Sequence, residues 1–173
     1  MANNTAERKP VLRMYLLGVC LIGVPAAARA ANKCAWINEA TASGLLGGKA
    51  VGEVSEAATG QPAVCTFTQI TAGAKRTLSV TVEVAADAHA RLTAIAQSCG
   101  AHATQLKAIG NEALVCAVDD RKGGAGERVV GRIRDQVYTI TIGSSLKNDP
   151  LLTRDVIKST IYTAAEQVAG NLF

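Results

Sequence analysis

Few side chains of this chain have the types and spacing that acid–base or nucleophilic chemistry requires. There are two histidines, His89 at the start of an expected helix and His102 in the loop that follows it. A Ser-His-Asp or Cys-His arrangement needs one of them as its base. Ser43 stands in Thr-Ala-Ser-Gly, and because no strand leads into it, it does not form a nucleophile elbow. The sequence therefore predicts no catalytic residues, and we expect that the protein is not an enzyme.

The acidic and glycine-rich residues between 119 and 126 predict neither a metal site nor a phosphate site. Asp119 and Asp120 are followed by Arg121 and Lys122, whereas calcium takes about six or more oxygen ligands. The glycine-rich stretch 123–126 leads into an expected strand, whereas a phosphate-binding loop opens a helix. We expect a hairpin loop here and no cofactor.

The N-terminal segment has the three parts of a cleavable signal peptide. Arg8, Lys9 and Arg13 supply positive charge, an apolar run covers residues 14–24, and small residues follow up to Ala30. The apolar run is far shorter than the roughly 20 residues that span a bilayer. We therefore expect residues 1–30 to be a signal peptide cut after Ala30, rather than a membrane anchor. Residues 31–173 are then a single domain that is periplasmic or secreted, with no stable membrane span.

The cysteines outside the signal segment predict disulfide bonds. They are Cys34, Cys65, Cys99 and Cys116, and an even number in an exported chain is expected to pair. Three connectivities are open, and the order along the chain favours Cys34–Cys65 with Cys99–Cys116. A zinc site is disfavoured because there is no Cys-x-x-Cys pair and neither histidine lies at ligand spacing from a cysteine.

The charge of the expected mature domain is close to zero. The whole chain has 18 basic and 14 acidic residues. Residues 1–30 hold four of the basic residues and one of the acids, which leaves 14 against 13 and a net charge of +1. The densest basic stretch that remains, residues 121–134, is interrupted by Glu127 and contains no aromatic residue. A nucleic-acid binder needs a clustered basic face with aromatic side chains for stacking, so we expect no nucleic-acid partner.

The periodicity of apolar residues predicts an α+β fold. Alternating residues predict strands over 51–54, 64–70, 78–84, 113–118, 127–134 and 137–142. Helical spacing predicts helices over 36–46, 86–99 and 150–169, the last capped by Asp149 with Pro150 as its first residue. Runs of antiparallel strands with helices between them predict one antiparallel sheet on which an N-terminal, a middle and a long C-terminal helix pack.

Two regions are candidates for an interaction surface. Trp36 stands beside the expected Cys34–Cys65 bridge, where it either packs as core or serves as an exposed aromatic anchor for a partner. The basic residues Arg121, Lys122 and Arg128 belong to the hairpin 119–128. A further candidate is the sheet face that the helices leave uncovered.

Three pieces of the sequence resemble the small exported or lipid-anchored domains of unknown function found in actinobacterial cell envelopes. The first is Cys34 followed by Ile37-Asn-Glu-Ala and Gly44-Leu-Leu-Gly47. The second is Cys65-Thr-Phe at the start of an expected strand, and the third is Ile109-Gly-Asn-Glu-Ala113 ahead of the expected strand 137–142. The resemblance covers most of residues 34–170 and implies a PsbP-like α/β sandwich, a bacterial source and a role at the envelope. It implies no catalytic residues. The chain departs from the lipid-anchored form because Lys33, rather than a small residue, precedes Cys34.

Three hypotheses of function follow. The first is an exported, non-enzymatic binding or interaction domain of the bacterial cell envelope, whose partner is a protein or a small ligand. The second is an inhibitor or immunity protein that blocks a secreted enzyme through a protruding loop. The third is a small periplasmic enzyme, which predicts a deep polar pocket holding His89 or His102. The first hypothesis has the most support from the sequence; the oligomeric state is left open.

Overall fold

The computed structural model describes residues 33–58, 61–71, 73–119 and 124–173, and of Ala101 and Asp119 only the backbone. All of them belong to one unit, Ala31–Phe173. The expected signal peptide and its cleavage after Ala30 lie outside the described residues, as do Arg121 and Lys122 of the expected hairpin.

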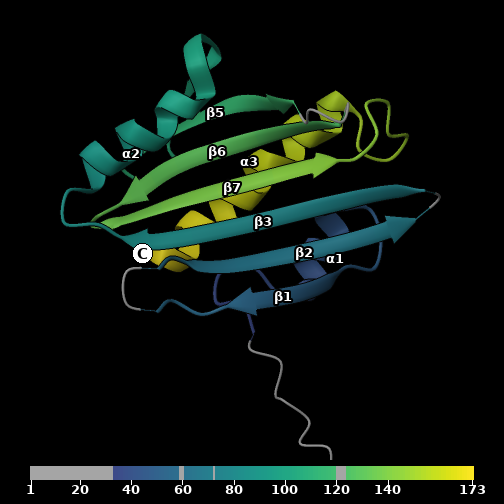
Figure 1. Cartoon of the computed structure of the whole chain (residues 1–173), viewed down its shortest axis with the longest axis horizontal. Helices are drawn as coiled ribbons and strands as arrows, with labels where there is room; N and C mark the ends of the chain where they lie inside the picture. The colour runs from purple at the N-terminus through teal and green to yellow at the C-terminus, as the bar shows by residue number, and fades with distance from the viewer. Residues whose placement is uncertain (1–32, 59–60, 72, 120–123) are drawn as a thin grey trace, which may run out of the picture. The chain divides into compact units, whose positions relative to one another are not determined.

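The fold is α+β, as the sequence predicts, and its strands form one seven-stranded antiparallel sheet. The strands are β1 (Val51–Ser55), β2 (Ala63–Thr71), β3 (Ala74–Val84), β4 (Thr104–Leu106), β5 (Glu112–Asp119), β6 (Ala125–Ile133) and β7 (Gln136–Ser144). The helices are α1 (Glu39–Leu45), α2 (Ala88–Ala96) and α3 (Arg154–Leu172), with a 3₁₀ helix η1 (Gln97–His102) after α2. Across the sheet the strands run β1-β2-β3-β7-β6-β5-β4, so β3 and β7 meet at its centre (Figure 1).

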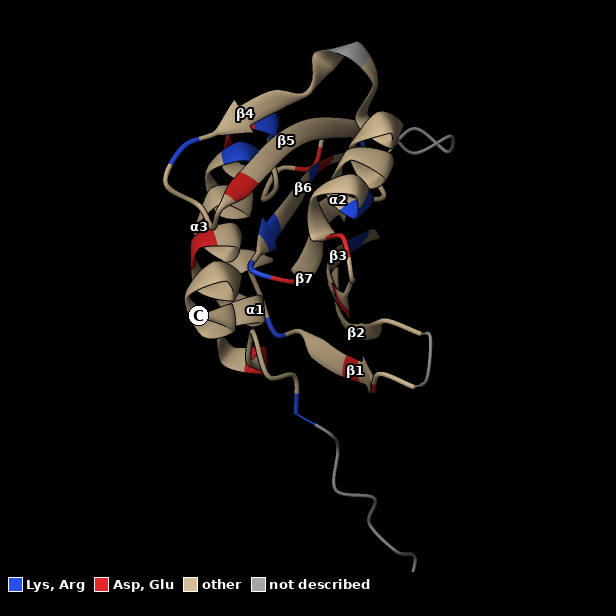
Figure 2. Ribbon diagram, turned by 90° about the vertical axis from the view of Figure 1, so that its left-hand side faces the viewer, with Lys and Arg blue, Asp and Glu red and all other residues tan. Residues whose placement is uncertain are grey.

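The helices are divided between the two faces of the sheet. Figure 2 shows α1 and α3 on one side, called the inner face below, and α2 on the other, the outer face. Residues that alternate along the strands are buried on the inner face, among them Phe67, Leu78, Val80, Ile140 and Ile142, each at most 1% exposed. On the outer face, Ala88 and Leu92 of α2 pack on Val130 and Val137. The outer side of β1, β2 and β3 carries no helix of the described chain.

Each of two glycines leaves room for the aromatic ring of the residue opposite it on the neighbouring strand. Gly131 lies opposite Tyr138 in the β6–β7 pair, and a Cβ atom at Gly131 would collide with the tyrosine hydroxyl. Gly52 lies opposite Phe67 in the β1–β2 pair, and a Cβ atom there would come within 2.8 Å of the phenyl ring. Both rings therefore lie over a neighbouring strand that has no side chain in their way. Burial raises the pKa of Tyr138 to about 12.

The ends of two helices differ from the prediction. The first helix begins at Glu39 rather than residue 36, because the Asn38 side chain accepts a hydrogen bond from the Thr41 backbone N–H at 2.8 Å. The last helix begins at Arg154, and Thr153 caps it through the Val156 N–H. The predicted start at Pro150 with Asp149 as cap is therefore wrong, and so is the predicted end at residue 169, since α3 continues to Leu172. The middle helix is also shorter than predicted, because it tightens to a 3₁₀ helix from Gln97.

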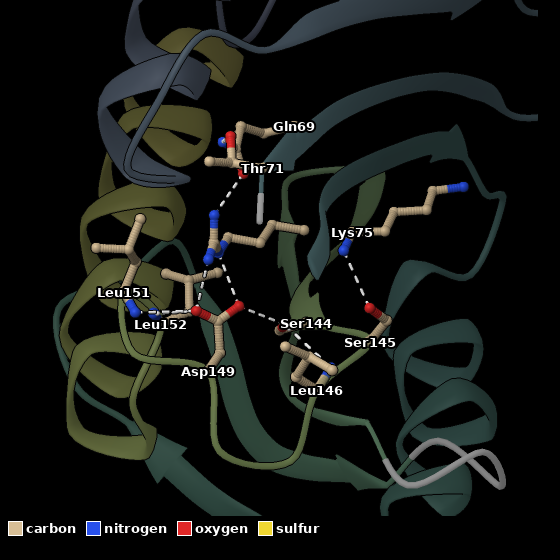
Figure 3. Close-up of polar contacts among 10 residues, drawn as sticks. Gln69, Thr71, Lys75, Ser144, Ser145, Leu146, Asp149, Leu151 and Leu152 are labelled. Carbon is tan, nitrogen blue, oxygen red and sulfur yellow. Dashed lines mark hydrogen bonds and ion pairs between the residues drawn. The ribbon is translucent and has the colours of Figure 1, made fainter. Parts of the chain in front are cut away.

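Asp149 does not cap a helix; its carboxylate forms a buried ion pair with Arg76 of β3. The guanidinium Nε and Nη2 donate to Asp149 Oδ2 and Oδ1, both at 2.7 Å, and the two side chains are 2% and 0% exposed. Arg76 Nη1 donates to Gln69 Oε1 at 2.7 Å, and Ser144 Oγ donates to the carboxylate. The backbone N–H groups of Leu151 and Leu152 donate to it as well. Figure 3 shows Asp149 at the centre of these contacts, which join β2, β3, β7 and the segment before α3.

The pKa of Asp149 lies well below its ordinary value. Burial of the carboxyl group by itself raises the pKa, but the hydrogen bonds from Arg76, Ser144 and the two leucine N–H groups lower it by more. Because the folded pKa is depressed, the stabilisation from this group is complete above its ordinary pKa of about 3.9 and is lost as the pH falls through the folded value.

Replacement of Asp149 by Asn will destabilise the fold strongly. The change leaves the Arg76 charge buried without a counter-ion, which costs about 3–5 kcal/mol in the free energy of unfolding. Urea denaturation at pH 7 measures this loss. The variant will also lose less stability than the wild type between pH 4 and pH 2, because it lacks the carboxylate that must be protonated. The double variant Arg76→Met with Asp149→Leu is the control, and it should recover much of the loss because no unpaired charge is left. Equal stability of wild type and Asp149→Asn would contradict the role of the pair.

Candidate binding site

The segment 33–38, which leads into α1, is fixed to the rest of the domain at three points. The Cys34–Cys65 disulfide joins it to β2, with a Cα–Cα distance of 5.8 Å. Ile37 is buried in the main core, 1% exposed. From the far end of α3, Asn171 Nδ2 donates a hydrogen bond to the Trp36 backbone oxygen at 2.8 Å. These contacts hold the segment in one place against the inner face.

One cleft lies beside this segment and is called the Trp36 cleft below. Its volume is about 570 Å³. Most of the residues that line it are apolar, and the polar ones are Gln61, Glu83, Gln136 and Asn171. The apolar ones are Trp36, Ala57, Ala58, Pro62, Ala63, Val82, Val84 and Leu172. Trp36 is partly buried and packs against the core, so one part of its ring serves the core and another faces the cleft. Val84 is 72% exposed at the mouth.

A second hollow lies between the same segment and strand β1, and is called the edge pocket below. Its volume is about 450 Å³, and it is lined by Lys33, Cys34, Ile37, Asn38, Glu39, Ala40, Gly52, Val54 and Phe67. Ile37 and Phe67 are almost fully buried and form its floor. Charged groups, Lys33 and Glu39, occur only on the side of the N-terminal segment. Segment 33–40 therefore takes part in a hollow on each side.

The uncovered part of the outer face is polar and flat rather than hollow. Its outward side chains on β2, β3 and β7 are mostly hydroxyl residues: Thr66, Thr68, Thr77, Ser79, Thr81, Thr139 and Thr141, all half-buried. They form rows across the strands, as in the register Thr66–Ser79–Thr141. At one end, where Gly126 lies opposite Gly143, there is a shallow hollow of about 440 Å³. A solvated sheet face accounts for this pattern.

Two of the residues that the sequence proposes for interaction, Trp36 and Arg128, lie on opposite faces of the sheet. Trp36 lies on the inner side, where it lines a cleft. Arg128 lies on the outer face, where its guanidinium contacts Thr141 of β7 and Ser98 of η1. The other two residues, Arg121 and Lys122, are not among the described residues.

His89 and Ser43, considered above as possible catalytic residues, make contacts that stabilise the fold. His89 Nδ1 lies 2.9 Å from Glu112 Oε2 on the surface, and Arg132 Nη2 donates to Glu112 Oε1 at 2.7 Å. The hydrogen bond from Arg132 lowers the pKa of Glu112; burial opposes this, and His89 adds to the lowering. Ser43 Oγ accepts a hydrogen bond from the Ala50 N–H and so fixes the start of β1. Neither histidine lines the Trp36 cleft, the edge pocket or the hollow at Gly126.

Both disulfides have the connectivity that the order of cysteines favoured. Cys34–Cys65 lies on the inner face, and Cys99–Cys116 joins η1 to β5 with a Cα–Cα distance of 5.6 Å. Such bonds persist in oxidising, extracytoplasmic compartments. No helix within the described ranges has the length and apolar character needed to cross a membrane. Among those residues there is also no cluster of three or more His, Cys, Asp or Glu side chains that could hold a metal ion.

In comparisons with known proteins, no protein-family model, curated protein or solved structure matches this chain.

Sequence reasoning found Trp36 but missed the rest of the cleft and the whole edge pocket. Val84 alternates with the buried Val80 and Val82, yet at the end of β3 it is exposed. Asn171 lies beyond residue 169, where the sequence pattern ends the last helix. The edge pocket depends on Gly52 and Phe67, which are neighbours only through strand pairing. The alternation around Phe67 indicated its burial but not the hollow above it.

Removal of the Cys34–Cys65 bridge will destabilise the domain and loosen the Trp36 cleft. The bridge spans 31 residues in sequence, so its loss through Cys34→Ser with Cys65→Ser costs about 4 kcal/mol by the chain-entropy estimate. Trp36 is the single tryptophan of the chain, so a red shift of its fluorescence emission in the variant reports its increased exposure to water. The matched control is Cys99→Ser with Cys116→Ser, which should cost a similar free energy but leave the emission maximum unchanged. Identical emission shifts in both variants would contradict the local role of the first bridge.

Proposed function

We propose that the mature chain is an exported, non-enzymatic binding domain of the bacterial cell envelope, and that its ligand or partner occupies the Trp36 cleft. The observation that carries this proposal is the cleft itself, formed beside a segment that a disulfide and the C-terminal helix hold in place. The resemblance to envelope domains and the two disulfides support an extracytoplasmic location, and the pattern of residues 1–30 supports export by a signal peptide.

The size and lining of the cleft suit recognition. Binding sites for small ligands are concave, about 300–1,000 Å³ in volume and mostly apolar, with a few polar groups that fix orientation. The Trp36 cleft has about 570 Å³ and apolar walls from Trp36, Val82 and Leu172. Gln136 and Asn171 supply amide groups at its border. A tryptophan beside such a cleft is also the residue type most often found to dominate binding energy in protein interfaces.

The cleft is held in shape before any partner arrives. Fixing a flexible segment on binding costs free energy, so a segment that is already fixed binds more tightly for the same contacts. Here the covalent bond at Cys34 and the Asn171 hydrogen bond hold Trp36 on both sides. The acid in the lining, Glu83, is bound to Arg91 at 2.6 Å. The cleft therefore presents mainly apolar surface and amides.

Loss of the Trp36 side chain will abolish most of the binding. The full chain, exported by its own host so that processing and disulfide formation take place, serves as bait on an envelope extract of that host. We expect one protein or small molecule in near-stoichiometric amount with the wild type. Trp36→Ala should reduce recovery about thirtyfold, since truncation of a dominant tryptophan costs about 2 kcal/mol or more. Val84→Arg, at an exposed position in the mouth, should have the same effect without disturbing the core.

The control is Thr139→Ala, which removes a hydroxyl from the outer face and should retain full recovery. Equal recovery with wild type, Trp36→Ala and Val84→Arg would exclude the cleft as the binding site. Loss of recovery with Thr139→Ala alone would move the site to the hydroxyl-rich outer face.

A further inference from the structure

Strand β1 forms one edge of the sheet, and Figure 1 shows it at the border. Among the residues that the structure describes, it pairs with β2 alone. Edge strands are often protected by proline, lysine or a bulge. The sequence of β1, Val-Gly-Glu-Val-Ser, contains neither proline nor lysine, and its pairing with β2 runs without interruption from Val51 to Ser55.

One hydrogen bond shows which residues of β1 point their backbone groups away from β2. The Gly52 N–H donates to Glu39 Oε1 of α1 at 3.1 Å, so it points away from the β2 neighbour. Backbone groups alternate in direction along an antiparallel strand. The carbonyl of Gly52 and both polar groups of Val54 therefore face the free edge too. The Glu39 carboxylate occupies the position that a carbonyl oxygen of a further strand would take, so an added strand must displace it from Gly52 to pair there.

The same two residues face the edge pocket. Gly52 and Val54 both line it, with Phe67 and Ile37 at its floor. A strand added beside β1 continues the pleat, so its side chains opposite Gly52 and Val54 point to the same face of the sheet. They would enter a mostly apolar hollow of about 450 Å³. A peptide at this edge thus obtains main-chain hydrogen bonds and a pocket for alternate side chains, the two elements of recognition by strand addition.

The charge at the edge selects the kind of strand. Glu53 is exposed on the outer face between Gly52 and Val54, and it forms no ion pair with any residue that the structure describes. A lysine or arginine directly opposite it on an added strand would be a favourable cross-strand pair. Antiparallel pairing with a second copy of this chain fits less well in the register centred on Glu53, because it sets the two glutamates opposite each other.

We propose that β1 accepts an extended segment of a partner polypeptide as an additional edge strand. Its apolar side chains enter the edge pocket, and a basic residue lies opposite Glu53. This inference rests on the proposed function as a binding domain, but it uses a different hollow, on the other side of segment 33–40.

The test uses a capped synthetic peptide in which valine alternates with threonine and one threonine is replaced by lysine. It is added up to millimolar concentration to the full exported chain labelled with ¹⁵N. We expect saturable shifts at residues 52–54. Exchange of the Val54 amide hydrogen should slow at least tenfold on saturation, because that N–H gains a partner. The Glu53 and Ser55 amides already face β2, so their exchange should not change.

Three comparisons separate strand addition from non-specific association. Val54→Pro removes the outward N–H while leaving the bonds to β2 in place, and should weaken peptide binding at least tenfold. Val54→Thr keeps the N–H and the branched shape, and should bind the peptide more tightly than Val54→Pro does. N-methylation of the peptide at every second residue should abolish binding in one register and spare it in the other. Absence of saturable binding, or equal binding by Val54→Pro and wild type, would overturn the proposal.

The outcomes also separate this inference from the proposed function. Recovery of a partner that depends on Trp36, together with no peptide binding, would remove the edge strand and leave the Trp36 cleft. Peptide binding that is insensitive to Trp36→Ala, with no partner recovered through the cleft, would support the edge and remove the cleft.

Discussion

The buried ion pair between Arg76 and Asp149 is the contact on which the rest of the architecture depends. A charge pair this deep is stable only when further hydrogen bonds satisfy both groups, and Gln69, Ser144 and two backbone N–H groups do so here. The pair fixes the segment before α3 against the centre of the sheet. Because α3 is one continuous helix to Leu172, the same contact also helps to position its far end, where Asn171 holds Trp36.

The N-terminal segment 33–40 links this architecture to both candidate sites. On one side it contributes Trp36 to a cleft, and on the other it contributes Ile37 and Glu39 to the edge pocket. The Cys34–Cys65 bond keeps the segment on β2 without a long helix to hold it. Binding at either hollow would therefore meet a surface that is already ordered, which reduces the entropic cost of association.

The flat outer face shows why exposure alone does not define a site. Its hydroxyl side chains repeat across β2, β3 and β7, they suit solvation by water, and the hollow at one end of the face is shallow. The candidate sites lie instead where regular structure ends, at the end of β3 and at the free edge of β1. There the sheet leaves backbone groups and apolar side chains that neighbouring elements cover only in part.

The sequence by itself determined the fold class, the approximate strands and the disulfide pairing that order along the chain favoured. These depend on local alternation, helical spacing and cysteine order, which are visible without tertiary contacts. Only the tertiary structure decided the role of Asp149: beside Pro150 it reads as a helix cap, but the buried guanidinium of Arg76, 73 residues away in sequence, binds its carboxylate more strongly than a helix end would. In the same way Gly52, Phe67 and Asn171 form sites only because strand pairing and helix packing bring distant residues together, and local sequence carries no signal for such contacts.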